Sequence, residues 1–291
     1  MTDRKGPPGR PAGLFVRWLA RATRRGPLAG VLGPALRFRV VRHEVALGAP
    51  LRVAVVSDLH FGFAANTAAR AALVRARVMA LAPDLVVFLG DIAGGLRGPG
   101  KVARVDAGCA ALAGYAAPLG CYAVLGNHDW DDDPAARARR DGPNRATALL
   151  EAAGWRVLEN EALDLGPVWL AGLGSQRAFR TGAWRHIGRD DAAVLDGVPE
   201  GKPLILLAHE PDVFPDLADR AMLVLSGHTH GGQVRLFGRA LVAPSRHGTA
   251  YALGHYREGR RQLVVSGGLG CSTIPLRVGI EPEITLVTLV P

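Results

Sequence analysis

The sequence has little cysteine and no long apolar run. Its 291 residues include three cysteines, Cys109, Cys121 and Cys271, which are too few and too widely spaced for a disulfide framework or a CxxC metal site. We therefore expect reduced thiols in the core of a cytosolic protein. No apolar run reaches the roughly 18 residues of a membrane-spanning helix, so no transmembrane segment is predicted. Hydrophobic residues make up 48% and charged residues 21%, which excludes a wholly disordered chain.

Acidic residues are nearly absent from the N-terminal region. Residues 1–43 carry ten basic side chains and one acid, Asp3, whereas the other residues hold 25 of each sign. The formal net charge of +9 therefore belongs to an N-terminal arm, and the rest of the chain is neutral. A protein that binds nucleic acid would also carry basic residues on its body, so this distribution favours attachment to an anionic surface instead.

We divide the chain into a basic amphipathic arm, 1–45, and one domain, 46–291. Within the arm, the spacing over 12–25 predicts a short helix with Phe15 and Trp18 on one side and arginines on the other. This pattern is typical of a helix that lies in a membrane interface, although the same helix could pack on the protein's own body.

A twin-arginine export signal is the minor alternative for the arm. Arg24 and Arg25 precede an apolar stretch, but that stretch is short, contains Pro34 and lacks a small-residue cleavage site. We therefore expect a cytoplasmic protein that is peripheral to the inner membrane.

Strand-like and helix-like segments alternate through the domain, which predicts an α/β fold. Apolar strand patterns occupy 53–56, 85–89, 122–125, 204–208 and 222–225, and helical patterns occupy 66–81, 101–114 and 144–153. Consecutive strands are expected over 155–172 and again at 233–243, 249–256, 261–266 and 283–290. Two packed mixed sheets with helices outside explain this order better than one parallel sheet.

Each of the five apolar strands is followed at once by polar residues of the kinds that bind metals. Because the carboxyl ends of such strands collect ligands, we expect these residues to converge. The seven candidate ligands are Asp58, His60, Asp91, Asn127, His209, His228 and His230. They offer imidazole nitrogens and carboxylate or amide oxygens without thiolate, which suits Mn, Fe, Zn or Co. Seven ligands are more than one tetrahedral ion can bind, but they suffice for two ions if one carboxylate bridges the two.

The same motifs resemble those of the calcineurin-like metallophosphoesterases over about residues 51–290. The strings that carry the resemblance are Asp58-x-His60, Gly90-Asp91, Gly126-Asn127-His128-Asp129, His209 and Gly227-His228-x-His230. Longer strings around His209 and His230, and the closing segment 268–285, resemble a bacterial branch of membrane-associated phosphodiesterases. The resemblance implies a four-layer sandwich, with two mixed sheets face to face and helices on each side.

The resemblance also implies a role for each residue of the site. One metal ion would take Asp58, His60, Asp91 and His230, and the other would take Asp91, Asn127, His209 and His228. His128 would face the substrate phosphate as a catalytic residue, with Asp129 holding its ring. Two divalent transition-metal ions, most simply Mn with Zn or Fe as alternatives, would activate a bridging hydroxide for in-line attack on phosphorus.

The reaction that we expect is hydrolysis of a phosphodiester or pyrophosphate bond at the cytoplasmic membrane surface. A narrower version is a UDP-diacylglucosamine pyrophosphohydrolase of lipid A synthesis, which would make the substrate lipid-linked. A nuclease is a weaker alternative because only the arm is basic. A non-catalytic scaffold is weaker still, because every candidate ligand and His128 are present.

The segment 173–190 departs from the branch that the chain resembles. Relatives in that branch tend to carry an acidic pair after the glycine that corresponds to Gly172, whereas this sequence continues with Arg177, Arg180 and further arginines. These arginines could bind a second phosphate or a phospholipid head group, or they could belong to a solvated loop.

Overall fold

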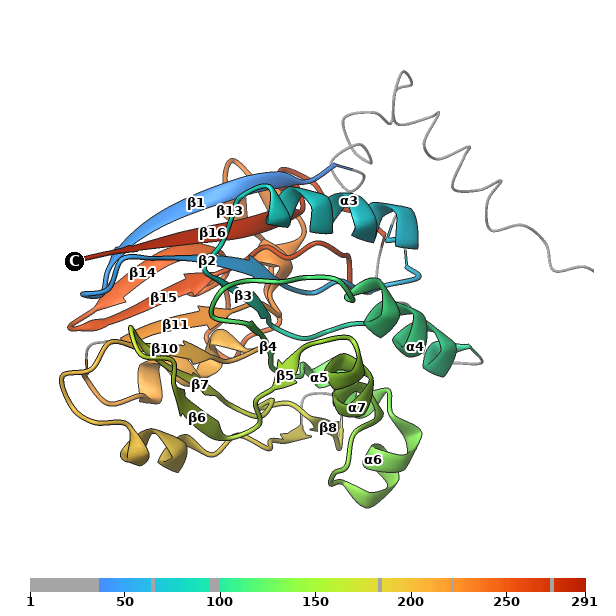
Figure 1. Ribbon diagram of the computed structural model, residues 1–291. Helices are drawn as coiled ribbons and strands as arrows, with labels where there is room; N and C mark the ends of the chain where they lie inside the picture. The colour runs from blue at the N-terminus through green and yellow to red at the C-terminus, as the bar shows by residue number, and fades with distance from the viewer. Residues whose placement is uncertain (1–36, 64–65, 95–99, 183–184, 221, 273–274) are drawn as a thin grey trace, which may run out of the picture.

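Two six-stranded mixed sheets form the framework of the protein (Figure 1). A computed structural model describes residues 37–63, 66–94, 100–182, 185–220, 222–272 and 275–291. The amphipathic helix predicted over 12–25 lies outside these residues. None of the helices in the described part is long and apolar enough to cross a membrane.

The first sheet has the strand order β1-β16-β2-β3-β4-β5. Strands β2, β3, β4 and β5 are parallel neighbours, and β16 pairs antiparallel with β2 and parallel with β1. The bounds are β1 (Arg39–Ala46), β2 (Leu51–Val56), β3 (Leu85–Phe88), β4 (Cys121–Ala123), β5 (Arg156–Val157) and β16 (Glu283–Val290).

The second sheet has the order β14-β15-β11-β10-β7-β6, with antiparallel pairs only at its two edges. Its strands are β6 (Glu161–Asp164), β7 (Trp169–Gly172), β10 (Leu204–Leu207), β11 (Met222–Ser226), β14 (Gly254–Glu258) and β15 (Arg261–Val265). Two antiparallel hairpins lie outside both sheets and comprise β8 (Phe179–Arg180) with β9 (His186–Ile187) and β12 (Arg235–Leu236) with β13 (Arg239–Ala240).

Apolar side chains fill the space between the sheets and cover their outer faces. Val53, Leu85 and their neighbours from the first sheet pack on Ile205 and Leu223 from the second. The outer face of the first sheet packs on α3 (Ala68–Met79), α4 (Lys101–Ala111) and α7 (Arg145–Ala152), and that of the second on the 3₁₀ helices η2 (Ala192–Gly197) and η3 (Pro211–Asp216). The predicted α/β fold of two packed mixed sheets is confirmed, with short 3₁₀ helices as its fourth layer.

Strand β1 corrects the predicted boundary at residue 45. Residues Arg39 to Ala46 pair in register with Glu283 to Val290, so β1 is an integral edge strand of the first sheet. The sequence analysis assigned this segment to the arm because Arg39 and Arg42 add to the basic charge. The burial pattern explains their presence, since an edge strand tolerates exposed arginines on its solvent side.

The remaining sequence predictions mostly match the described elements. The strands and helices expected in the first two thirds of the chain shift by a few residues at most. The strand expected over 233–243 is wrong, because that segment contains the short β12–β13 hairpin instead. The three cysteines are buried and unpaired, as predicted.

Candidate metal centre

The carboxyl ends of β2, β3, β4, β10 and β11 meet at one edge of the sandwich, where six of the seven candidate ligands form two groups. Five of these ligands leave their strands in the left-handed region, with φ of 50° at Asp58, 43° at His60, 61° at Asp91, 66° at His228 and 53° at His230. Such values are uncommon for residues other than glycine and are retained where the surrounding structure enforces them. The chain therefore turns sharply at each strand end and directs several side chains inward.

Glycines create the space into which these side chains converge. Gly90 has φ of 92°, and a Cβ atom there would collide with the backbone of Gly126. A Cβ atom at Gly126 would collide in turn with the carboxylate of Asp91 and the ring of His209. The two glycines therefore allow the loops to approach closely, and side chains at either position would close the site.

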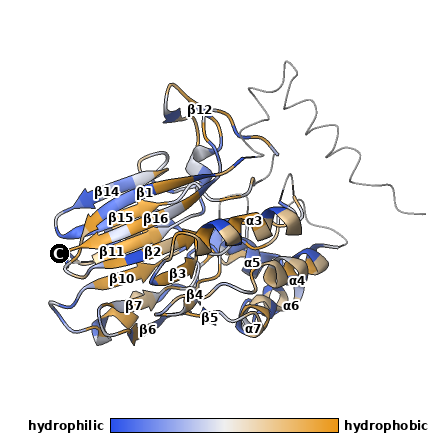
Figure 2. Cartoon of the chain, turned by 45° about the horizontal axis from the view of Figure 1, so that its top comes forward, coloured by the Kyte–Doolittle hydropathy of each residue, from blue (hydrophilic) through white to orange (hydrophobic). Residues whose placement is uncertain are grey.

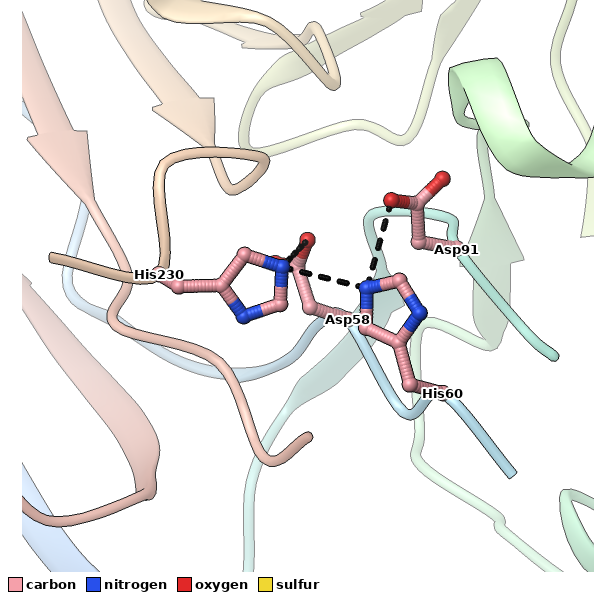
Figure 3. A group of neighbouring side chains, drawn as sticks. All are labelled: Asp58, His60, Asp91 and His230. Carbon is pink, nitrogen blue, oxygen red and sulfur yellow. Dashed lines mark hydrogen bonds and ion pairs between the residues drawn. The ribbon is translucent and has the colours of Figure 1, made fainter. Parts of the chain in front are cut away.

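The first group of ligand atoms comes from Asp58, His60, Asp91 and His230, and these atoms lie within 4.8 Å of one another (Figure 3). The Nε2 atoms of His60 and His230 are 3.1 Å apart. Nε2 of His60 is 3.5 Å from an oxygen of Asp91, and Nε2 of His230 is 3.6 Å from an oxygen of Asp58. Two nitrogens and two carboxylates that face one common point are suited to holding a cation.

The second group comprises Asp91, His209 and His228, whose ligand atoms also lie within 4.8 Å of one another. Nε2 of His209 is 3.4 Å from an oxygen of Asp91 and 3.2 Å from Nδ1 of His228. Because Asp91 belongs to both groups, its two oxygens can serve two neighbouring cation positions. All the residues of the two groups are buried.

Asn127 adds an independent observation at this site. It opens the short helix α5 (Asn127–Asp131) directly after Gly126, and its side-chain Oδ1 is buried without a hydrogen-bond partner. A buried amide oxygen is rarely left unpaired, because its desolvation is costly. A cation bound beside it would satisfy this oxygen, so the residues present fit the metal ions that the motifs imply.

Backbone carbonyls orient two of the imidazole rings. Nδ1 of His209 donates to the carbonyl oxygen of Leu89 at 2.5 Å, and Nε2 of His228 donates to that of Pro244 at 2.8 Å. These bonds leave Nε2 of His209 and Nδ1 of His228 unprotonated in the neutral rings and directed at Asp91 and at each other. A hydrogen bond from the ring nitrogen that does not bind the metal fixes the tautomer of a metal-binding histidine.

The electrostatic environment favours neutral imidazoles at three of the ligands. At His209 burial would lower the pKa, but the charge of Asp91 raises it well above the usual value. Burial lowers the pKa of His60 to about 3, and it lowers the pKa values of His228 and His230 well below the usual value. Burial alone would raise the pKa of Asp91, but His209 and the other neighbouring histidines lower it well below its usual range. Burial raises the pKa of Asp58 to about 6. A bound cation would pair with the carboxylate of Asp58 and so offset the cost of burying its charge.

His128 lies at the edge of the site rather than in either ligand group. Its ring is 32% exposed, and its centroid is 5.2 Å from that of His60. Nδ1 of His128 bonds to Asp132 at 3.1 Å, and Asp132 also pairs with Nζ of Lys101 at 2.7 Å. Burial would lower the pKa of His128, but the charges of Asp91 and Asp132 raise it. Protonated His128 is thus suited to donating a proton to a substrate oxygen.

The structure corrects the predicted role of Asp129. Its carboxylate accepts backbone N–H groups of Asp91 at 2.8 Å, Ile92 at 2.9 Å and Gly126 at 2.8 Å, so it holds two strand-end loops together. Asp132 holds the His128 ring instead. Asp132 is not among the residues predicted from the sequence. Its position four residues after His128 on one helical face was the available signal.

Two further buried charges support the site and were not found from the sequence. Glu210 accepts Oγ of Ser175 at 2.6 Å and the backbone N–H of Gln176 at 3.0 Å, which fastens the segment that carries Arg177. The guanidinium of Arg277 is buried and donates to backbone carbonyls of residues 267–270. That loop in turn donates from Gly270 to the backbone of Asp58 at 2.7 Å.

Comparison with known proteins agrees with the geometry. The family model for calcineurin-like phosphoesterases matches residues 51–232. The chain is 29% identical to an uncharacterised metallophosphoesterase of Aquifex aeolicus over 87% of this chain and 90% of that protein, and 33% identical to the metallophosphoesterase YkuE of Bacillus subtilis over 71% and 68%. It is 32% identical to a zebrafish (Danio rerio) transmembrane protein with a metallophosphoesterase domain, of which the match spans 53%. The chain therefore belongs to the calcineurin-like phosphoesterase family of metal-dependent hydrolases.

Proposed function

We propose that the protein binds two divalent cations and hydrolyses a phosphodiester or pyrophosphate bond. The observation that carries this proposal is the position of Asp91, whose carboxylate belongs to both ligand groups. The unpaired Oδ1 of Asn127 supports a cation in the second group. The first position would be held by Asp58, His60, Asp91 and His230, and the second by Asp91, Asn127, His209 and His228.

The donor set supports transition metals at both positions. Imidazole nitrogens outnumber carboxylates, and no cysteine belongs to either group among the described residues. Mn is the first choice, with Zn or Fe as alternatives. When bound, such ions supply an activated water and neutralise charge on the phosphate.

The residues around the cations then have distinct tasks. Two aspartates reduce the positive charge of the cations, and the site as a whole remains attractive to a phosphate anion. His128 is held by Asp132 through Nδ1 and has Nε2 for the substrate. We assign it the donation of a proton, or of a hydrogen bond, to the leaving oxygen as the bond to phosphorus breaks.

A pocket beside His228 supports a substrate with a second anionic group. Its volume is about 570 Å³, and its lining includes Arg177, Arg246 and Pro244. Arg177 donates to the carbonyl of Pro244 at 2.7 Å, which is the same oxygen that orients His228. Arg246 pairs with Asp216, whereas Arg177 forms no ion pair within the described part of the chain. Its free charge suits a second phosphate, as in a pyrophosphate or an esterified headgroup.

We place the reaction at the cytoplasmic face of an anionic membrane. The basic charge of the N-terminal arm supports this placement, since each basic residue near such a surface contributes about 1 kcal/mol of attraction. The narrower hypothesis of a UDP-diacylglucosamine pyrophosphohydrolase stays a prediction. Nucleic acid remains the less favoured substrate, because the excess basic charge is confined to the arm.

A substrate and metal screen tests the proposal. Purified full-length protein is loaded with Mn, Zn, Fe or Mg and assayed against phosphomonoesters, phosphodiesters and pyrophosphates. We expect turnover of diesters or pyrophosphates with a transition metal and two metal equivalents by elemental analysis. Asp91→Asn protein purified in parallel measures contaminating activity. Turnover no higher than this background with every metal would overturn the proposal, as would a stoichiometry of one.

A further inference from the structure

The hairpin β12–β13 and the two residues that follow it expose large apolar side chains. Leu236 is 49% exposed, Phe237 104%, Leu241 57% and Val242 73%. These four, which we call the apolar finger, account for most of the strongly exposed large apolar residues in the described part of the chain. Scattered apolar residues are ordinary on a surface, but a cluster on a projecting hairpin indicates a partner (Figure 2).

The conformation of the hairpin turn is unfavourable for a phenylalanine at position 237. The register pairs Leu236 with Arg239, so Phe237 and Gly238 form a two-residue turn, with φ of 50° and 77°. A turn with positive φ at both positions strongly favours asparagine, aspartate or glycine at the first position. Phenylalanine is strained there and its side chain is fully exposed. Its presence therefore does not serve the local stability of the turn.

The charge around the finger indicates which partner it fits. The segment 235–246 contains Arg235, Arg239 and Arg246 and no acidic residue. Arg235 donates to the backbone carbonyls of Gly231 and Gly238, and neither Arg235 nor Arg239 forms an ion pair in the described part. Apolar side chains with arginines behind them match the interface of an anionic membrane, where aromatic and aliphatic groups enter the acyl boundary and cations remain at the headgroups.

The finger is continuous with the metal centre at both of its ends. The chain enters it just after the candidate ligand His230 and leaves it at Pro244, whose carbonyl accepts Nε2 of His228 at 2.8 Å. The same Pro244 lines the arginine-bearing pocket. We propose that the apolar finger inserts into an anionic lipid interface and thereby presents the metal centre to phosphoesters carried by lipids. The insertion stands on the hairpin alone, and the class of substrate rests on the proposed function.

A fluorescent label at the tip tests insertion directly in the full-length protein. Since the three native cysteines are buried and burial raises the pKa of the Cys109 thiol to about 12, a Phe237→Cys thiol can be labelled selectively with an environment-sensitive dye. Vesicles of phosphatidylglycerol and phosphatidylcholine should shift the emission to the blue, and brominated lipid should quench it. A label at Leu73→Cys, on an exposed position of α3, should respond less.

Three results of the labelling experiment would overturn the proposal. Binding to vesicles without a shift at residue 237 would mean that another part of the chain docks, and would overturn the proposal. Emission that is already blue-shifted without lipid would show that residues 1–36 or a second copy of the chain cover the tip, and would overturn it too. No binding to vesicles at all would have the same consequence.

Phe237→Asn separates the membrane role from a structural one. Asparagine suits the turn better, so the melting temperature should stay the same or rise, while partitioning into anionic vesicles should fall by roughly tenfold or more because the buried phenyl surface is lost. Leu73→Asn is the matched control and should keep wild-type partitioning. An undiminished affinity of Phe237→Asn protein for vesicles would contradict insertion.

Two substrates distinguish failure of the finger from failure of the proposed function. Phe237→Asn protein should hydrolyse a soluble chromogenic phosphodiester at the wild-type rate, and should lose activity only on a phosphodiester lipid in vesicles. Wild-type protein that inserts but hydrolyses neither substrate would refute the proposed function and leave the membrane contact standing. Equal rates of wild-type and Phe237→Asn protein on the phosphodiester lipid in vesicles would refute the proposal that the apolar finger presents the metal centre to lipid substrates.

Discussion

The seven candidate ligands and the arginine-bearing surface around them differ in how the fold holds them. The histidine and aspartate ligands are buried, and most leave their strands in left-handed backbone conformations. Arg177 and the segment 235–246, which we call the rim, lie largely at the surface and are held mainly by hydrogen bonds to loop backbone. A substitution among the ligands therefore disturbs several loops at once, whereas the rim can change without moving them.

This difference separates two kinds of specificity. The buried ligands determine which reaction the site can carry out, and they match the motifs of the whole family. We propose that the rim influences which phosphoester reaches them, and its Arg177 belongs to segment 173–190, where this sequence departs from the branch that it resembles. The comparison can be tested by substituting each part in turn.

The largest effect is expected at the shared carboxylate. Asp91→Asn removes one ligand charge from both cation positions, so activity should fall to background and both metal equivalents should be lost or weakened together. Elemental analysis and the assay measure these effects, and exposed Asp106→Asn serves as the control. Retention of one tightly bound equivalent would show that Asp91 serves a single position.

The next effect is expected at His128. His128→Ala should lower turnover by roughly 10²–10⁴ while the metal content stays unchanged, because His128 is placed beside the ligands and not among them. Asp132→Asn should also lower turnover, but by a smaller factor, since it leaves the His128 ring without the carboxylate that orients it. Loss of metal in either variant would show that the substituted residue helps to bind the metal ions.

Asp129 sharpens the contrast with Asp132. An asparagine at 129 turns an N–H donor toward backbone donors, so Asp129→Asn should lower the free energy of unfolding by about 1–3 kcal/mol. Thermal unfolding of the metal-free protein measures this loss. Asp132→Asn should also lower the free energy of unfolding, because the ammonium of Lys101 loses its buried partner, but unlike Asp129→Asn it should shift the pH dependence of turnover through His128. A pH profile that changes equally in the two variants would contradict the separate roles that their hydrogen bonds assign.

A smaller effect, limited to one class of substrate, is expected in the rim. Arg177→Gln should raise KM by roughly tenfold, which corresponds to about 1.4 kcal/mol, for substrates with a second anionic group. The rate on a simple phosphodiester and the metal content should not change. Arg156→Gln, at an exposed ion pair with Glu161, is the matched control. A loss of turnover at saturating substrate would place Arg177 in the chemistry instead of in recognition.

Most of the framework could be predicted from the sequence because its signals are local. The strands that precede Asp58, Asp91 and His209 are short, largely apolar runs followed by polar residues, and the structure places strands there. The edge strand β1 was missed because an edge can carry exposed arginines such as Arg39, so its composition resembles that of a basic arm. The hairpin at 235–240 was missed because its turn lacks the usual asparagine.

The supporting charges of the site could not be predicted, because they depend on contacts between distant segments. Asp132 is recognisable only once Lys101 from α4 lies beside it. Glu210 is recognisable only once Ser175 supplies its hydroxyl. Such pairings with distant segments are decided by the packing of the fold. The spacing of Asp132 from His128 indicates only the contact within one helix, and nothing local indicates Lys101 or Ser175.

The place of β16 has a consequence for the order of assembly during synthesis. This strand lies between the edge strand β1 and β2 in the first sheet, although residues 283–290 are translated after all seven candidate ligands. The ribosome must therefore release nearly the whole domain before the sheet that carries Asp58 and Asp91 can close. Pairing over so long a sequence separation is slow. We therefore expect a nascent chain to lack a finished first sheet until β16 is in place.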